Sequence, residues 1–296
     1  MDVFDGQEVN RGASSAFTFI ALIAAISITV AEDPKPVPKP RALTDWEKKV
    51  VDKINGYRKA AGVKEVSVSV ELSNGCQKHA DYLVKNYVEQ KSEGATGNDE
   101  IDARPGYTPE GKKAGAVSDI NYIEPLRAVD ESMESVFQRA AMLQPDLEKI
   151  GIGVACPNKN WYVVIDVKSG LTAESPAPFV VYPGDKQAAV PLQYKPEGRN
   201  AIPDDKDARA GYPVTVTFRH LDTVESIKGT LKDVRGKEVP VWLVTPDTIA
   251  DAKHLKSIAI IAQDPLERST TYTAWFEAEV NGEKATKTWT FTTGKK

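Results

Sequence analysis

The most informative stretch of the sequence is Gly75-Cys76-Gln77-Lys78-His79-Ala80-Asp81-Tyr82-Leu83. It holds the only histidine in the first two thirds of the sequence. Its apolar residues recur at spacings of three and four, and this period predicts a helix over about 71–88. One face of that helix carries Leu72, Cys76, His79, Leu83 and Tyr87.

The segments around this helix follow from equally local signals. Thr44 and Glu47 form a capping box that begins an earlier helix, which ends near Gly62. Residues 91–122 are rich in Gly, Ser, Asn, Asp and Pro and predict a long loop. A third helix is predicted over about 125–140, and two strands over 150–155 and 161–167 form a hairpin. Helices followed by a hairpin predict an α+β sandwich.

The C-terminal third has an entirely β pattern. Residues 169–189 predict a linker that leads into the first strand. Short apolar or alternating runs follow, and Asn281-Gly282 between two of them predicts a hairpin with a type I′ turn. Six or seven short strands separated by turns predict a β-sandwich over 190–296. His220 and His254 lie in this region with no partner nearby in sequence.

The composition narrows the possible function classes. A chain of 296 residues is long enough for two domains, and 41% hydrophobic with 27% charged residues is typical of soluble globular proteins. The net charge is -4, and no Lys/Arg cluster is interleaved with aromatic residues. These features argue against nucleic acid or an anionic membrane as a partner.

The N-terminus carries a signal for export. Residues 16–31 contain no charge, which is short for a bilayer span of about 20 apolar residues but suits the core of a signal peptide. We expect a signal peptide over 1–31 and a Pro-rich linker over 32–43. The mature chain is then secreted, periplasmic or at the cell surface, with no integral membrane segment. An uncleaved membrane anchor is the alternative.

Two cysteines remain after export, Cys76 and Cys156. An oxidising compartment permits a disulfide between them. Cys76 also lies on the apolar face of a predicted helix, so a buried free thiol is the other interpretation.

Several short blocks along residues 44–168 resemble one known family. The blocks are Asn55-x-x-Arg58 with Gly62, His79-Ala80 with Tyr82-Leu83, Pro105–Gly111, and Phe137-Gln138-Arg139 followed by Ile150–Gly153. Their order and spacing are similar to bacterial members of the CAP superfamily, the cysteine-rich secretory, antigen 5 and pathogenesis-related-1 group. The resemblance implies a three-layer α-β-α sandwich in a secreted protein.

The resemblance also implies a site. Two histidines and two acidic residues line the cavity of familiar CAP members, and such a set can hold a divalent metal such as zinc. Here Asn98 stands where a loop histidine often occurs, Gly115-Ala116-Val117 lacks the acid, and Gln138 replaces the second histidine. The cavity residues implied for this chain are His79, Asn98, Glu100, Gln138 and Arg139. No cofactor is expected, and zinc only if His79 and Glu100 both bind it.

Each of these residues also has a purely structural interpretation. His79 can be a hydrogen-bonded core residue, Glu100 part of a solvated loop cluster, and Arg139 a partner in a surface ion pair. Cys76 and His79, at i and i+3, could place a thiol near an imidazole, although such pairs are usually packing. The sequence contains no phosphate-binding loop, Rossmann glycine pattern, Cys-x-x-Cys or His-Glu-x-x-His.

A second resemblance concerns the C-terminal region. Residues 266–272 and 288–293 are similar to the closing strands of bacterial Ig-like domains. The resemblance implies an Ig-like sandwich with the role of a spacer, an adhesion module or a contact to the cell envelope.

Together these patterns favour a secreted, non-enzymatic protein that binds a small ligand or a component of the cell envelope. A metal-assisted hydrolase acting on peptide or cell-wall material is the alternative, and it requires His79 and Glu100 to converge on a water. A purely structural two-domain spacer is a third interpretation.

Overall fold

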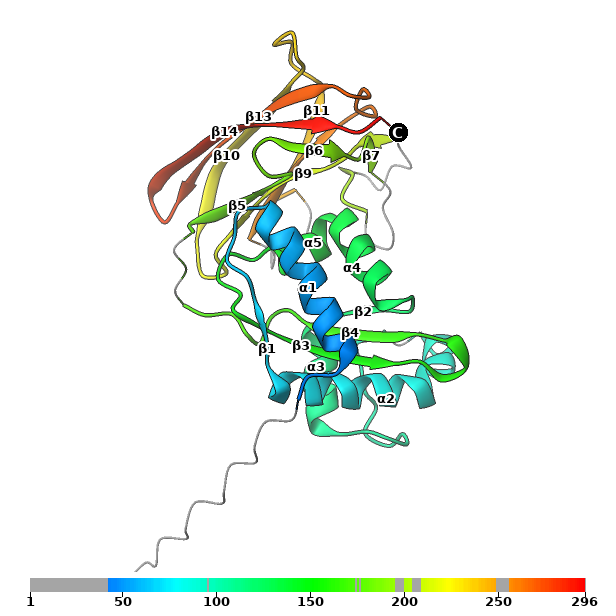
Figure 1. The fold of residues 1–296 in the computed structure, drawn as a ribbon. Coiled ribbons are helices and arrows are strands. Elements are labelled where there is room, and N and C mark those ends of the chain that lie inside the picture. The colour runs from blue at the N-terminus through cyan, green and yellow to red at the C-terminus, as the bar shows by residue number, and fades with distance from the viewer. Residues whose placement is uncertain are drawn as a thin grey trace, which may run out of the picture. The chain divides into compact units, whose positions relative to one another are not determined.

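The computed structural model describes residues 42–295, except Ala95, Glu174, Pro176 and the segments 195–199, 204–208 and 249–255. The described residues lie in one compact unit, Pro40–Lys296 (Figure 1). The predicted signal peptide, most of the Pro-rich linker and His254 fall outside them. Among the helices within the described ranges, none is both long and apolar enough to cross a membrane.

The N-terminal region is mostly helical. Its elements are α1 (Asp45–Ala60), β1 (Ser67–Val68), α2 (Val70–Ser92), α3 (Pro109–Val117), β2 (Ser118–Asn121), α4 (Pro125–Glu134), α5 (Val136–Met142), β3 (Lys149–Ala155), the 3-10 turn η1 (Pro157–Lys159) and β4 (Tyr162–Asp166). The predicted capping box is present, because the Thr44 hydroxyl accepts from the Glu47 N–H and the Glu47 carboxylate accepts from the Thr44 N–H.

Two sequence predictions in this region need correction. The predicted loop 91–122 contains α3 and β2, and α3 begins where Thr108 caps a helix with Pro109 in its first turn. The single helix predicted over 125–140 is two helices, α4 and α5. The chain is extended at Ser135, whose hydroxyl caps α5 by accepting from the Gln138 N–H.

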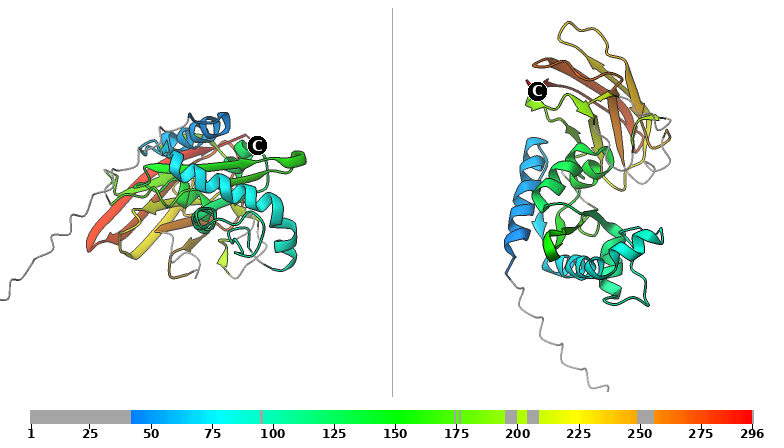
Figure 2. Two further views of the ribbon diagram at one scale, coloured as in Figure 1. Left: turned by 90° about the horizontal axis from the view of Figure 1, so that it is seen from below. Right: turned by 90° about the vertical axis from the view of Figure 1, so that its right-hand side faces the viewer.

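Four strands in the order β1-β3-β4-β2 form a sheet between two helical layers. Helices α2 and α3 pack on one face, and α1 and α4 lie on the other (Figures 1 and 2). Alternate residues of β4 serve the two layers: Tyr162 and Val164 join the cluster under α2, while Val163 and Ile165 join the larger core on the α1 side. The predicted α+β fold with three layers, α-β-α, is confirmed.

The motif Ile150-Gly-Ile-Gly153 sets how closely α2 approaches β3. Ile150 and Ile152 are buried in the core on the α1 side, so the two glycines face α2. A Cβ at Gly153 would overlap the backbone of Cys76, and one at Gly151 would crowd Leu72. The bare glycine face therefore lets the helix backbone lie directly on the strand.

The C-terminal region is a β-sandwich. Its strands are β5 (Phe179–Tyr182), β6 (Gln187–Val190), β7 (Gln193–Tyr194), β8 (Ala210–Gly211), β9 (Val214–Phe218), β10 (Val224–Lys232), β11 (Val241–Val244), β12 (Ser257–Ala262), β13 (Thr271–Val280) and β14 (Glu283–Thr293). One sheet has the order β10-β13-β14-β6 and the other β11-β12-β9-β5, with β7-β8 as a small separate pair. Asn281 and Gly282 both have positive φ, as a type I′ turn requires.

The predicted linker 169–189 is wrong in its second half. β5 pairs with β9, and β6 pairs with β14, so both strands belong to the sandwich. One hydrophobic core runs without a break from the CAP-like helices into the sandwich. It includes Val50 and Met133 on one side and Tyr212, Phe276 and Trp289 on the other.

The close contact of α2 with β3 yields a test. Gly153→Ala places a methyl group against the Cys76 backbone, and overpacking of this kind lowers the free energy of unfolding by about 1–3 kcal/mol. Gly56→Ala is the matched control, because no atom of another described element lies within 4 Å of its Cβ, and alanine favours a helix by about 1 kcal/mol. Urea unfolding of both variants compares the two. Equal stability of Gly153→Ala and the parent chain would contradict the packing.

Candidate functional site

His79 lies on α2 in a fully buried position. Its Nδ1 is 2.9 Å from Oε1 of Glu100, which is also buried, and its Nε2 is 2.8 Å from the carbonyl oxygen of Gly97. The second carboxylate oxygen of Glu100 accepts a hydrogen bond from the Thr108 N–H at 3.0 Å. The sequence prediction that brought His79 and Glu100 together thus describes a real contact, inside the protein.

The hydrogen bonds of the His79 ring fix where its protons lie. A carbonyl oxygen only accepts, so Nε2 must carry the proton in its contact with Gly97. Nδ1 and the Glu100 carboxyl then share one further proton, either as imidazolium and carboxylate or as neutral imidazole and carboxylic acid. In both cases neither ring nitrogen keeps a lone pair that points to solvent.

Helix α3 closes the space above this pair. A Cβ at Gly115 would overlap the His79 ring, and a Cβ at Gly111 would overlap the Glu100 carboxylate. The two glycines are one helical turn apart, so α3 presents a bare stripe that packs on both side chains. The pair is sealed between α2 and α3.

Zinc does not fit these residues. A catalytic zinc site has about three protein ligands and an open position for water. His79 and Glu100 already use their polar atoms on each other, on Gly97 and on Thr108. No group of three His, Cys, Asp or Glu side chains in the described part of the chain is placed to hold one ion.

Asn98 is close to His79 but performs a different task. Its amide group donates to the carbonyl oxygens of Gly115 at 2.7 Å and Ser118 at 3.0 Å. It therefore ties the loop before Glu100 to the junction of α3 and β2. Asn98, at the position where a loop histidine often occurs, therefore links two backbone segments by hydrogen bonds.

A second polar centre forms around Asp119 on β2, which the sequence analysis did not select. Gln138 of α5 donates to one oxygen of this carboxyl group. The other oxygen is 2.6 Å from the hydroxyl of Ser132 on α4, and that hydroxyl is also 2.9 Å from the carbonyl oxygen of Ala128. Gln138, predicted to line the cavity beside His79, instead belongs to this centre.

Proton counting at this second centre points to a neutral carboxylic acid. The Ser132 hydroxyl has one hydrogen but two acceptors within reach, so a proton on Asp119 lets every contact form. With that proton, Asp119 would donate to Ser132 while Ser132 donates to Ala128. Burial raises the pKa of Asp119 above its ordinary value, in the direction that favours this proton, and outweighs the hydrogen bonds with Ser132 and Gln138, which lower it.

Arg139 is fully buried, yet it does not face either centre. Its guanidinium lies 5.0 Å from the ring centre of Tyr182 and 4.6 Å from that of Tyr212. It donates to the carbonyl oxygens of Met133 at 2.6 Å and Pro213 at 2.7 Å. The prediction that Arg139 lines the cavity is therefore replaced by a role at the junction of α5 with the sandwich.

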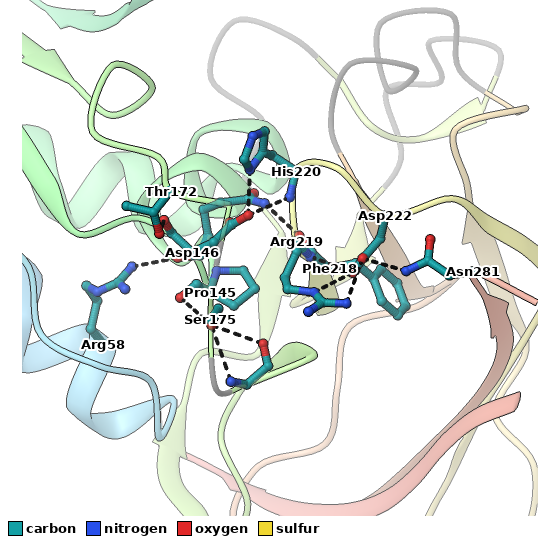
Figure 3. A network of polar contacts seen from close by, with 12 residues as sticks. Arg58, Pro145, Asp146, Thr172, Ser175, Phe218, Arg219, His220, Asp222 and Asn281 are labelled. Carbon is teal, nitrogen blue, oxygen red and sulfur yellow. Dashed lines mark hydrogen bonds and ion pairs between the residues drawn. The ribbon is translucent and has the colours of Figure 1, made fainter. Parts of the chain in front are cut away.

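A polar network crosses the same junction (Figure 3). Asp146 is buried and accepts from the backbone N–H of His220 at 2.9 Å and from its Nδ1 at 2.5 Å. Next to it, Arg219 forms an ion pair with Asp222 at 2.9 Å, and Asp222 also accepts from Asn281 at 2.8 Å. His220, which had no partner in the sequence, joins the turn before β3 to the end of β9.

The two cysteines are free thiols in the structure. Cys76 is a buried residue of α2, and burial raises the pKa of its thiol to about 12. Cys156 is exposed. Of the two interpretations of Cys76, the geometry corresponds to the buried thiol, and a thiol that stays protonated is a poor nucleophile beside His79.

The comparison with known families agrees with this architecture. Residues 51–167 match the family model described as CAP, the cysteine-rich secretory protein family. The chain carries a CAP domain. No curated protein matches the chain.

Three solved structures are similar to parts of the chain, each at low sequence identity. An outer surface protein of Borrelia burgdorferi is 16% identical, with 42% of this chain and 93% of that one covered and a TM-score of 0.29. The venom allergen-like protein 4 of Schistosoma mansoni is 13% identical, with 45% and 97% covered and a TM-score of 0.30. A DUF4426 family protein of Pseudomonas aeruginosa is 19% identical, with 29% and 76% covered and a TM-score of 0.21.

The neutral acid at Asp119 predicts a pH dependence of stability. The Asp119 carboxyl ionises at about pH 3.9 in the unfolded chain but at a higher pH in the folded protein. Its contribution to the free energy of unfolding is therefore complete below about pH 3.9. Above it, stability falls by up to about 1.4 kcal/mol per pH unit until the folded carboxyl ionises. Asp119→Asn keeps the same hydrogen-bond pattern and does not titrate. In urea unfolding between pH 4 and 7, the free energy of unfolding of Asp119→Asn should rise relative to that of the parent chain as the pH increases. The same pH dependence of the free energy of unfolding in both proteins would contradict a raised pKa of Asp119.

The free thiols make a second prediction. In the folded protein, prepared without reductant, Ellman's reagent should titrate one thiol quickly, that of Cys156. The second, Cys76, should react only in denaturant, because its thiol is buried and protonated. Cys156→Ser is the control and should abolish the fast reaction. A chain that titrates no thiol even when unfolded would contain the disulfide.

Proposed function

We propose that this chain is an exported CAP-domain protein that binds a small ligand or a component of the cell envelope and does not catalyse a reaction. The observation that carries the proposal is the state of the residues at the centre of the CAP fold. His79 and Glu100 hold each other in a sealed position, and Asn98 and Gln138 donate to protein groups. Because these side chains stabilise the fold of the domain, we assign ligand binding to its outer surfaces.

The alternative of a metal-assisted hydrolase has less support. That chemistry needs an activated water on an accessible ion and a base within hydrogen-bond reach. Both carboxyl oxygens of Glu100 are already engaged in hydrogen bonds, one with Nδ1 of His79 and one with the N–H of Thr108. A water between His79 and Glu100 would have to replace a 2.9 Å contact that α3 covers.

The β-sandwich fits the role of a spacer or an adhesion module that presents the CAP domain. The cation–π contacts of Arg139 with Tyr182 and Tyr212, and the unbroken hydrophobic core, favour a fixed junction over a flexible hinge. Secretion and a position at the cell envelope rest on the predicted signal peptide and Pro-rich linker of the sequence.

Glu100→Gln separates binding from catalysis. Its amide N–H can donate to Nδ1 of His79, and its amide oxygen can accept from Thr108, so the hydrogen-bond pattern survives while the carboxylate is lost. We expect the variant to fold and to co-sediment with purified cell walls or lipid vesicles as strongly as the parent chain. Neither protein should release soluble fragments from cell walls.

Calorimetric titration with zinc completes this test. The parent chain should show no tight one-to-one complex, because His79 and Glu100 already bind each other and the backbone around them. A tight zinc complex, or fragment release that Glu100→Gln abolishes, would contradict the proposal in favour of the hydrolase. Failure of the parent chain to bind either walls or vesicles would contradict its binding half.

A further inference from the structure

A hollow of about 280 Å³ lies where α1 meets the strands β5 and β6. We call it the junction hollow. It is lined by Lys53, Gly56, Tyr57 and Ala60 of α1 together with Tyr182 and Gln187 of the sandwich. The polar centres of the CAP domain take no part in it. Its volume is close to the lower end of ligand sites, which begin at about 300 Å³, so it suits a small ligand or one unit of a longer chain.

Gly56 is the clearest sign that the floor of this hollow is kept open. It sits inside α1, where glycine costs about 1 kcal/mol relative to alanine. No atom of another described element lies within 4 Å of the position its Cβ would occupy, and its φ is not in the left-handed region. Neither packing nor backbone geometry therefore requires glycine here. A ligand that must approach the helix backbone closely would require it.

The walls of the hollow combine aromatic surface with compensated charge. The rings of Tyr57 and Tyr182 meet edge to face, with centres 6.5 Å apart. Lys53 forms an ion pair with Asp130 at 2.7 Å, and the Tyr57 hydroxyl donates to the same carboxylate at 2.5 Å. Because the ammonium already has its counter-ion, the hollow favours a neutral ligand over an anion.

Hydrogen-bond donors remain at the rim. Gln187 accepts from the Gly184 N–H at 2.8 Å and donates one amide hydrogen to the Tyr182 hydroxyl at 3.3 Å, which leaves its second N–H. Lys53 has three N–H groups, and the ion pair with Asp130 uses only one in its closest contact. These donors suit a ligand with hydroxyl or carbonyl oxygens around an apolar ring face.

We propose that the junction hollow binds a neutral saccharide unit. The C–H face of a sugar ring would lie on the tyrosine rings and over Gly56, and its oxygens would accept from Lys53 and Gln187. The inference deepens the proposed function, because it names the ligand class and the surface through which the protein would contact envelope material.

Saturation-transfer NMR on the full chain tests the site with tri-N-acetylchitotriose as the probe. We expect transfer to the sugar with the parent chain. Gly56→Leu projects an apolar side chain into the hollow from a position where a Cβ meets no atom within 4 Å, so its affinity should fall at least tenfold. Its melting temperature, measured in parallel, shows whether the variant is folded. Lys53→Met, which keeps an unbranched apolar stem and removes the ammonium group, should weaken binding several-fold. Lys48→Leu, an exposed position on the same helix outside the hollow, is the matched control and should change binding less than twofold.

Two results would overturn the inference. One is saccharide binding that Gly56→Leu leaves unchanged. The other is no saccharide signal with the parent chain, including the case in which decanoate, tested in parallel as an acyl chain, binds in its place. If the parent chain still co-sediments with cell walls or vesicles in those cases, only the junction hollow is wrong. If it binds none of them, the proposed function fails as well.

Discussion

The buried contact between His79 and Glu100 is the constraint on which this CAP domain depends. An ionisable pair taken out of water needs every remaining polar atom satisfied, because an unpaired member is strongly destabilising. The carbonyl of Gly97 and the N–H of Thr108 satisfy those atoms, and the glycine face of α3 packs closely over the pair. The loop between α2 and α3 is thereby fixed at three points. His79 and Glu100 resemble half of a metal site, but their hydrogen bonds instead hold this loop in place.

Two buried arginines extend the same principle through the rest of the fold. Arg58 donates to the carbonyl oxygens of Lys64, Met142, Gln144 and Leu147, and so gathers the turn that precedes β3. Burial lowers the pKa of Arg58 to about 10, which leaves it charged at neutral pH. Arg139 acts similarly next to the sandwich, where it donates to the carbonyl oxygens of Met133 and Pro213. Buried cations that donate to backbone carbonyls, and in the case of Arg139 also lie against aromatic rings, order the chain around the CAP sheet.

Local signals predicted the elements that depend on local chemistry. The Thr44 capping box, the spacing of Leu72, Cys76 and Leu83, and the Asn281-Gly282 turn each specify their own conformation. The break at Ser135 was also readable, since Ser135-x-x-Gln138 has the form of a capping box inside the predicted helix. Helix α3 was missed because its glycines, which lower helix propensity, are there to pack on His79 and Glu100.

Long-range contacts explain what the sequence could not supply. Asp119 and Ser132 meet only because β2 lies beside α4, and nothing in either segment marks the pair. Arg139 reaches a carbonyl 74 residues further along the chain, and the junction hollow joins residues of α1 to β5 and β6, more than a hundred positions away. The sequence made a meeting of His79 and Glu100 a requirement of the hydrolase alternative, and it could not tell whether the two side chains meet or whether such a contact is open to solvent.

The most direct test of this account is the ring N–H of His79. In a proton–nitrogen NMR spectrum, Hε2 should give a slowly exchanging resonance, shifted by its hydrogen bond to Gly97 and unmoved by added Zn²⁺. A ring proton lost to rapid exchange with water, or one that shifts on stoichiometric addition of zinc, would show that the imidazole is open to ligands and would contradict the account.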